Sequence, residues 1–178
     1  MKYLLFLLIL TSCGRIPHEE PSCTFIQNEY GERVSWYEAP VILGIDSAMP
    51  SHLKPAIYEA ARTWNVAYGK ELIRIVDRPY DNMIYYKTYW PGAYQEANTR
   101  IEWYDTTIYS ATINVNAYNY QFYYGSGYGV EFKSLMIHEL GHVLGLGHSD
   151  GVMSPYLAEG VTRWDIDSSI IHNLTCEY

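Results

Sequence analysis

The chain has 178 residues, of which 48% are hydrophobic and 18% are charged, a composition typical of a globular protein with room for one domain. Lys and Arg number 12 against 20 Asp and Glu, which gives a formal net charge of −8. So acidic a balance argues against a phosphate-binding surface, and we expect no nucleic-acid partner.

Residues 1–12 have the pattern of a secretory signal. Lys2 precedes an apolar run that is too short to cross a bilayer. The tetrapeptide Leu-Thr-Ser-Cys at residues 10–13 resembles the lipobox of bacterial lipoproteins. This resemblance implies that Cys13 is lipidated and, because Gly14 rather than aspartate follows, that the protein is exported to the outer membrane. An ordinary signal peptide is the alternative.

Residues 13–33 are expected to form a lipid-anchored tether, because they contain prolines and charges without periodicity, and residues 34–178 to form the folded domain. The chain has three cysteines, so lipidation of Cys13 leaves a pair. Cys23 and Cys176 lie near the two ends of the mature chain, and we predict a disulfide between them because domain termini often lie close together.

The first predicted elements are a strand and an amphipathic helix. Residues 34–45 alternate well enough for a strand. Residues 51–69 place apolar side chains on one stripe of a helix, with Ser51 as a possible N-cap and Pro55 in the first turn. Gly69 is expected to end this helix.

Further strands are predicted from β-branched and aromatic content, separated by the turn-rich runs 77–82 and 90–98. They cover residues 72–76, 83–89 and 107–117. Residues 121–129 contain three glycines and are expected to form a flexible loop. Residues 162–174 are a predicted final helix, with Thr162 and Asp165 placed as in a capping box. The order strand, helix, strands, helix indicates an α/β or α+β domain.

Residues 138–148, His-Glu-Leu-Gly-His-Val-Leu-Gly-Leu-Gly-His, carry a complete metal-site pattern. His138 and His142 are spaced to project from one face of a helix, and Gly145 can take the left-handed conformation that turns the chain back. His148 is then returned as a third ligand. Three protein ligands leave a tetrahedral position for water, which indicates a catalytic zinc site with Glu139 beside it.

This pattern resembles the metzincin metalloproteases, and within them the matrixin type, in which serine follows the third histidine as Ser149 does here. The resemblance implies a metzincin-like α+β fold (an α/β sandwich): a twisted mixed sheet with an amphipathic helix, an active-site helix and a C-terminal helix. It also implies a methionine turn at Met153. For Tyr156 we favour a pocket-wall or packing role.

In matrixins an edge strand of the sheet holds the substrate, and residues 111–116 look like that strand. Ile113, Asn114 and Val115 are therefore the candidate substrate-binding residues, and an internal strand is the alternative. The resemblance also opens a rival role for Cys23, whose thiolate would bind zinc as a latency switch.

The implied activity is that of a zinc endopeptidase that hydrolyses peptide or protein substrates with Glu139 as general base, and we expect a monomer. One Zn²⁺ is expected, since His18, His52 and His172 form no second ligand cluster. Calcium is possible through acidic loop residues, which are Asp77, Asp81 and Asp105.

Two other functions stay open at this point. One is a non-catalytic zinc-containing module that binds a surface partner through some of the 19 tyrosines, although tyrosines at strand edges explain many of these equally well. The retained Glu139 argues against it, because a structural site needs no base. The other is a zinc amidase acting on cell-wall peptide.

Overall fold

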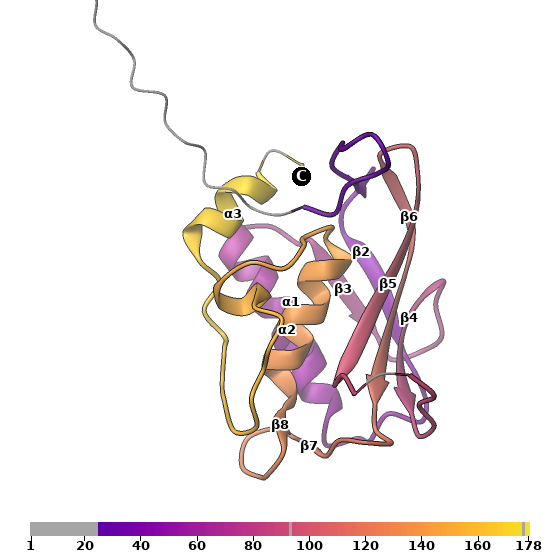
Figure 1. Cartoon of the computed structure of the whole chain (residues 1–178), viewed down its shortest axis with the longest axis vertical. Helices are drawn as coiled ribbons and strands as arrows, with labels where there is room; N and C mark the ends of the chain where they lie inside the picture. Colours follow the sequence, from indigo (N-terminus) through magenta and orange to yellow (C-terminus); the bar gives the residue numbers. More distant parts are fainter. Residues whose placement is uncertain (1–24, 93, 176) are drawn as a thin grey trace, which may run out of the picture.

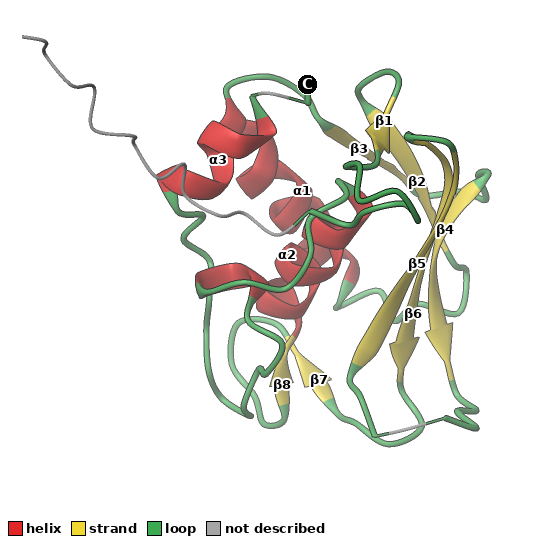
Figure 2. Cartoon of the chain, turned by 45° about the horizontal axis from the view of Figure 1, so that its top comes forward, coloured by secondary structure: helices red, strands yellow, loops and turns green. Residues whose placement is uncertain are grey.

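A computed structural model describes residues 25–92, 94–175 and 177–178. In the described chain one twisted sheet faces a layer of helices, which are α1 (Lys54–Tyr68), α2 (Phe132–Val143) and α3 (Ser168–Leu174) (Figure 1). All three helices lie on the same side of this sheet (Figure 2). The mixed α/β fold with a mostly parallel sheet confirms the predicted fold class. No described helix is both long and apolar enough to cross a membrane.

The main sheet has five strands in the order β1-β6-β4-β2-β3, and β5 is added along β6. The pairs along the first five are parallel, whereas β5 runs antiparallel to β6. Their bounds are β1 Ser35–Trp36, β2 Val41–Ile45, β3 Ile73–Val76, β4 Asn82–Lys87, β5 Ala97–Tyr104 and β6 Thr107–Asn116. Strand β5 lies against the zinc-motif helix α2, and we had not predicted it from the sequence.

The strand that we expected to bind substrate at the edge of the sheet is an internal strand. Ile113, Asn114 and Val115 lie in β6, as a strand was predicted there, but β6 pairs with β4 on one side and with β5 on the other. Ile113, for example, is opposite both Ile84 and Thr99. These residues cannot form an edge, so the prediction was wrong, and β5 occupies that place.

The predicted first strand is divided into two. β1 and β2 are separated by residues 37–40, which end in Pro40. A proline cannot donate a hydrogen bond to a neighbouring strand, so it breaks a continuous ladder. Residues 25–33, expected in the tether, pack on the domain instead: Phe25 is buried and forms a bridge with Leu146.

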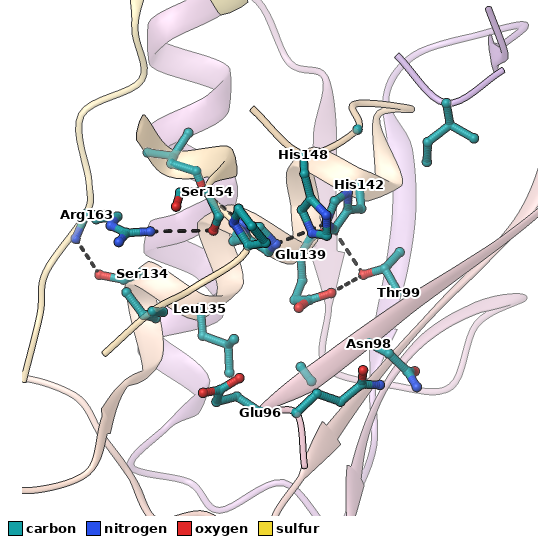
Figure 3. Close-up of a pocket in the computed structure, with 18 residues that line it drawn as sticks. Glu96, Asn98, Thr99, Ser134, Leu135, Glu139, His142, His148, Ser154 and Arg163 are labelled. Atoms are coloured by element: carbon teal, nitrogen blue, oxygen red, sulfur yellow. Dashed lines mark hydrogen bonds between the residues drawn. The ribbon is translucent and has the colours of Figure 1, made fainter. Parts of the chain in front are cut away.

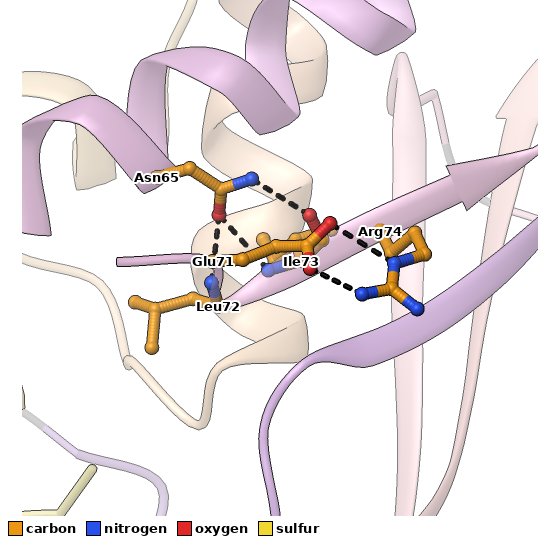
Figure 4. A network of polar contacts seen from close by, with 5 residues as sticks. All are labelled: Asn65, Glu71, Leu72, Ile73 and Arg74. Atoms are coloured by element: carbon orange, nitrogen blue, oxygen red, sulfur yellow. Dashed lines mark hydrogen bonds and ion pairs between the residues drawn. The ribbon is translucent and has the colours of Figure 1, made fainter. Parts of the chain in front are cut away.

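Helix α1 begins at Lys54 rather than at Ser51, and no side chain caps its first turn. Pro55 lies in that turn, and Gly69 ends the helix with a φ of 87°, as predicted. Asn65 then fixes the return of the chain into β3 (Figure 4). Its Oδ1 accepts hydrogen bonds from the backbone N–H groups of Leu72 and Ile73, and its Nδ2 donates to the Ile73 carbonyl. The apolar side of α1, which includes the fully buried Trp64, packs into the core.

Two further segments differ from the prediction. The glycine-containing loop includes a short parallel pair, β7 (Phe122–Tyr123) with β8 (Val130–Glu131), directly before α2. The last helix, α3, starts only at Ser168, so Thr162 and Asp165 form no capping box there. The preceding residues are held by contacts with α2, which the local pattern could not reveal.

Candidate metal centre

Helix α2 is held at its start by a buried carboxylate. Glu131 is the N-cap, and its side chain accepts hydrogen bonds from the backbone N–H groups of Lys133 and Ser134 at 3.2 and 2.8 Å. A carboxylate at this position satisfies donors that have no partner within the helix and complements its dipole. The apolar positions of α2, among them Met136, Leu140 and Val143, are fully buried. The helix is thus a rigid support for the residues on its other side.

The end of α2 turns sharply at Gly145, whose φ is 86°. Gly145 N–H donates to the His142 carbonyl and Leu146 N–H donates to the Gly141 carbonyl, both at 3.0 Å. This pair of bonds is the Schellman arrangement. A Cβ at Gly145 would lie 2.5 Å from the Val34 carbonyl oxygen, so the position has both the conformation and the space for glycine alone. The turn brings His148 back towards the helix.

The structure brings together His138, His142 and His148, whose ligand atoms all lie within 4.8 Å of one another. Figure 3 shows His142 and His148 side by side above Glu139. Backbone carbonyls orient two of the rings. His138 Nδ1 lies 2.8 Å from the Val152 oxygen, and His142 Nδ1 lies 2.7 Å from the Leu146 oxygen. These contacts assign the ring hydrogen to Nδ1 and leave each Nε2 lone pair free to bind a metal.

The two oriented rings are neutral near physiological pH. Burial, reinforced by the neighbouring His142, lowers the pKa of His138 to about 4, and burial also lowers the pKa of His142. The two Nε2 atoms lie only 3.0 Å apart. Two neutral acceptor nitrogens facing each other at this distance repel unless a cation lies between them. This donor set fits Zn²⁺, which takes neutral imidazole nitrogens in a compact arrangement.

Glu139 lies beside the histidines and is almost completely buried. The Thr99 hydroxyl, from β5, donates a hydrogen bond to its Oε2 at 2.5 Å. Burial raises the pKa of Glu139 to about 7, partly opposed by the Thr99 bond and assisted by the negative charge of Glu96. A carboxylate with a pKa near neutrality, next to a metal site, has the proton affinity that a general base needs.

Met153 packs against α2 at Gly141, which lies between His138 and His142 in the sequence. It ends a short 3₁₀ turn, Gly151–Met153, and is buried. A Cβ on Gly141 would lie 2.3 Å from its Sδ, so only glycine at this helix position lets the turn approach so closely. The preceding residue, Val152, supplies the carbonyl that orients His138. The turn that ends at Met153 therefore packs against α2 and orients the ring of His138.

A cleft of about 400 Å³ opens beside the histidines. Its walls come from the start of β5, from α2 and from the loop after Met153. The lining includes Leu157 and, as Figure 3 shows, Glu96, Thr99, Ser134, Leu135, Ser154 and Arg163. Tyr156, for which we favoured a pocket-wall or packing role, is 81% exposed and lies outside this lining, so that prediction was wrong.

Other expected sites are not formed, or lie outside the described residues. Within the described chain, the histidine triad is the one group of His, Cys, Asp and Glu side chains close enough to hold a metal ion. Asp77, Asp81 and Asp105 form no such group, so calcium binding by these residues is not supported; Asp77 pairs with Lys54 at 2.7 Å. The expected lipidation at Cys13 and the disulfide between Cys23 and Cys176 concern residues that the structure does not describe.

Sequence reasoning missed two residues of the site, Thr99 and Arg163. Thr99 is in the unpredicted strand β5, where the alternation of Ala97, Thr99 and Ile101 with polar residues was the available signal. Arg163 lies within residues 162–174, for which we predicted a helix, and only its contacts with α2 place it in the cleft.

The chain matches the family model for matrixin, a peptidase family, over residues 23–172. No curated protein matches it. The matched range includes the sheet, α1 and α2 as well as the histidine triad, so the likeness extends well beyond residues 138–156.

Proposed function

The chain belongs to the matrixin family, and from that premise we propose that it is an endopeptidase in which Glu139 is the general base. Family membership and the histidine triad make the protein a zinc-dependent metallopeptidase that acts on peptide or protein substrates. The proposal adds two points. Glu139 is the general base, and the enzyme cleaves bonds within the substrate chain rather than at its ends. The observation that carries it is the buried carboxylate of Glu139 next to three histidines that converge on one point.

His138, His142 and His148 would hold the zinc, and the bound ion supplies Lewis-acid activation of water and of the peptide carbonyl. Glu139 takes the proton from the attacking water at its carboxylate. Its protonated form then delivers that proton to the departing amine, so no covalent intermediate with the protein is needed. The Thr99 hydroxyl, bonded to Oε2, holds the carboxylate in place through both transfers.

Internal cleavage requires a site that accepts a chain extended on both sides of the scissile bond. Among the described strands β5 pairs only with β6, so its other edge is free, and the first residues of β5, Ala97 to Thr99, line the cleft. An extended peptide can add to this free edge by main-chain hydrogen bonds. β5 thus takes the role that we had expected of Ile113 to Val115 in β6.

The test separates chemistry from metal binding. Glu139→Gln keeps the shape of the side chain and an acceptor for Thr99, so the protein should fold and retain zinc while its kcat falls by about 10² to 10⁴. His142→Ala should lose the metal itself. Glu59→Gln, which removes a partly exposed carboxylate from α1, is the control and should keep the wild-type rate.

Zinc content and peptide hydrolysis are measured on the same samples. Equal zinc content and equal hydrolysis in wild type and Glu139→Gln would show that Glu139 is not the base. Zinc retention without cleavage of any peptide by the wild type would instead favour a non-catalytic module or an amidase.

Export as a lipoprotein remains a proposal that rests on the sequence of residues 1–14. Mass spectrometry of the mature N-terminal peptide tests it. A diacylated or triacylated Cys13 is expected, and an unmodified Cys13 would remove the membrane location as well.

A further inference from the structure

Arg163 introduces a positive charge into the cleft of an acidic protein. Its side chain is partly buried and lines the same cavity as His138 and Glu139. Its Nη1 lies 3.5 Å from the Ser154 carbonyl oxygen, a long contact that leaves most of the guanidinium donors unused. Among the described residues, neither Arg163 nor Arg78 has a carboxylate within ion-pair distance, whereas Arg33, Arg62, Arg74 and Arg100 each have one. Of these two arginines, only Arg163 lines the cleft.

The backbone around Arg163 is fixed by contacts with the start of α2. Arg163 N–H donates to Ser134 Oγ at 2.8 Å, and Ser134 Oγ donates in turn to Glu131. The next residue, Trp164, donates through Nε1 to Glu131 Oε2 at 2.8 Å, and Lys133 lies 4.4 Å above its ring. The network anchors the loop to the same helix that carries the histidines. These contacts fix the backbone position from which the Arg163 side chain reaches the cleft lining.

The opposite wall of the cleft carries the opposite charge. Glu96 lies directly before β5, and Figure 3 shows it on the other side of the cleft from Arg163, which lies beside Ser154 and Ser134. An acidic substrate side chain is therefore attracted at one end of the cleft and repelled at the other. The effect of a carboxylate should depend on which substrate position carries it.

We propose that Arg163 is a specificity-determining residue that selects substrates with an Asp or Glu side chain close to the scissile bond. The inference deepens the proposed peptidase function and rests on it. A guanidinium can bind a carboxylate through two parallel N–H···O bonds, a geometry that an amide or an apolar side chain cannot match. Arg163 lines the same cleft as Glu139, so we expect the selected side chain close to the cleaved bond and examine the two positions on either side of it.

Matched peptides test the proposal. The starting point is one cleaved peptide, in which Glu or Gln is placed at each of the two positions on either side of the scissile bond. The cleavage of these peptides is measured with three zinc-loaded proteins: wild type, Arg163→Gln and Arg62→Gln. Arg62 is exposed on α1, so its variant makes the same change in net charge away from the cleft. Arg163→Gln keeps the backbone N–H that bonds to Ser134, so the loop should retain its place.

At one position, wild type and Arg62→Gln should cleave the Glu peptide with a kcat/KM about five- to tenfold above that of the Gln peptide. Arg163→Gln should cleave both equally, at about the rate of the wild type on the Gln peptide. The wild-type preference should shrink in high salt. Equal rates for Glu and Gln peptides at all positions in the wild type, or an undiminished preference in Arg163→Gln, would overturn the proposal.

Binding measurements keep this test separate from the proposed activity. If no peptide is cleaved, the endopeptidase proposal fails. Peptides of one common sequence that carry a single Glu or a single Gln at successive positions are then titrated by calorimetry into zinc-loaded Glu139→Gln with and without Arg163→Gln. Tighter binding of a Glu peptide that disappears with Arg163→Gln supports the charge selection. Equal affinities for the Glu and Gln peptides at every position contradict it.

Discussion

Gly141 is the point at which the metal-site helix meets the methionine turn, and Gly141→Ala tests that contact. The added Cβ would lie 2.3 Å from Met153 Sδ, 3.0 Å from Met153 Cε and 3.1 Å from a ring carbon of Trp64. Trp64 is fully buried and donates through Nε1 to the Ile137 carbonyl at 2.9 Å, so it has little freedom to move. The collision must therefore displace Met153.

The expected magnitude is a balance of two effects. Alanine is favoured over glycine in a helix by about 1 kcal/mol, whereas overfilling a packed core typically costs about 1 to 3 kcal/mol. With separations so far below contact distance, we take the upper part of that range and expect a net loss of about 1 to 2 kcal/mol. For a chain of this size, that lowers the Tm by roughly 2 to 8 °C.

The same displacement should weaken zinc binding, because the turn that holds Met153 also supplies the Val152 carbonyl that orients His138. Disturbing such a supporting contact typically lowers metal affinity about 10- to 100-fold. Thermal unfolding of the metal-free protein and competition with a chelator measure the two quantities. Adding Met153→Ala should relieve part of the cost, so the double variant should be more stable than the sum of the single effects predicts, by about 1 kcal/mol. A Gly141→Ala protein with wild-type Tm and zinc affinity would refute the reasoning.

Two further predictions concern the end of α2 and the base. Gly145→Ala should lower the free energy of unfolding more than Gly69→Ala does. Both glycines have a positive φ, but only a Cβ at Gly145 would meet a backbone oxygen, that of Val34, at 2.5 Å. Equal losses in thermal unfolding would contradict this. Thr99→Val removes the bond that lowers the pKa of Glu139, so that pKa should rise and the carboxylate should form only at higher pH. The acidic limb of the kcat/KM profile should then move to higher pH, and an unmoved limb would show that Thr99 does not act on the base.

The parts of the site that could be predicted from sequence are those determined by local spacing. His138 and His142 are one helical turn apart, and Gly145 and Gly69 end their helices in the conformation expected for glycine. These features depend on a few consecutive residues, so the pattern contains all the information needed. Once the helix forms, this spacing places His138 and His142 on one face, where both can bind one zinc ion.

The parts that could not be predicted depend on contacts between distant segments. β5 pairs with β6 across a hairpin and places Thr99 against Glu139, 40 residues further along the chain. That pairing also makes β6 internal, which no property of Ile113 or Val115 alone reveals. Arg163 likewise reaches the cleft through a bond to Ser134, 29 residues earlier, that overrides the local helix pattern.

The central claim is that hydrolysis depends on one zinc ion held by His138, His142 and His148. The most direct measurement is a titration of metal-free protein with Zn²⁺, with peptide products mapped by mass spectrometry at each point. Cleavage within peptide chains should rise in proportion to bound zinc, reach its maximum at one equivalent, and disappear again when a chelator removes the metal. Unchanged cleavage in the metal-free protein, or no cleavage of a diverse peptide library at full zinc occupancy, would contradict the account.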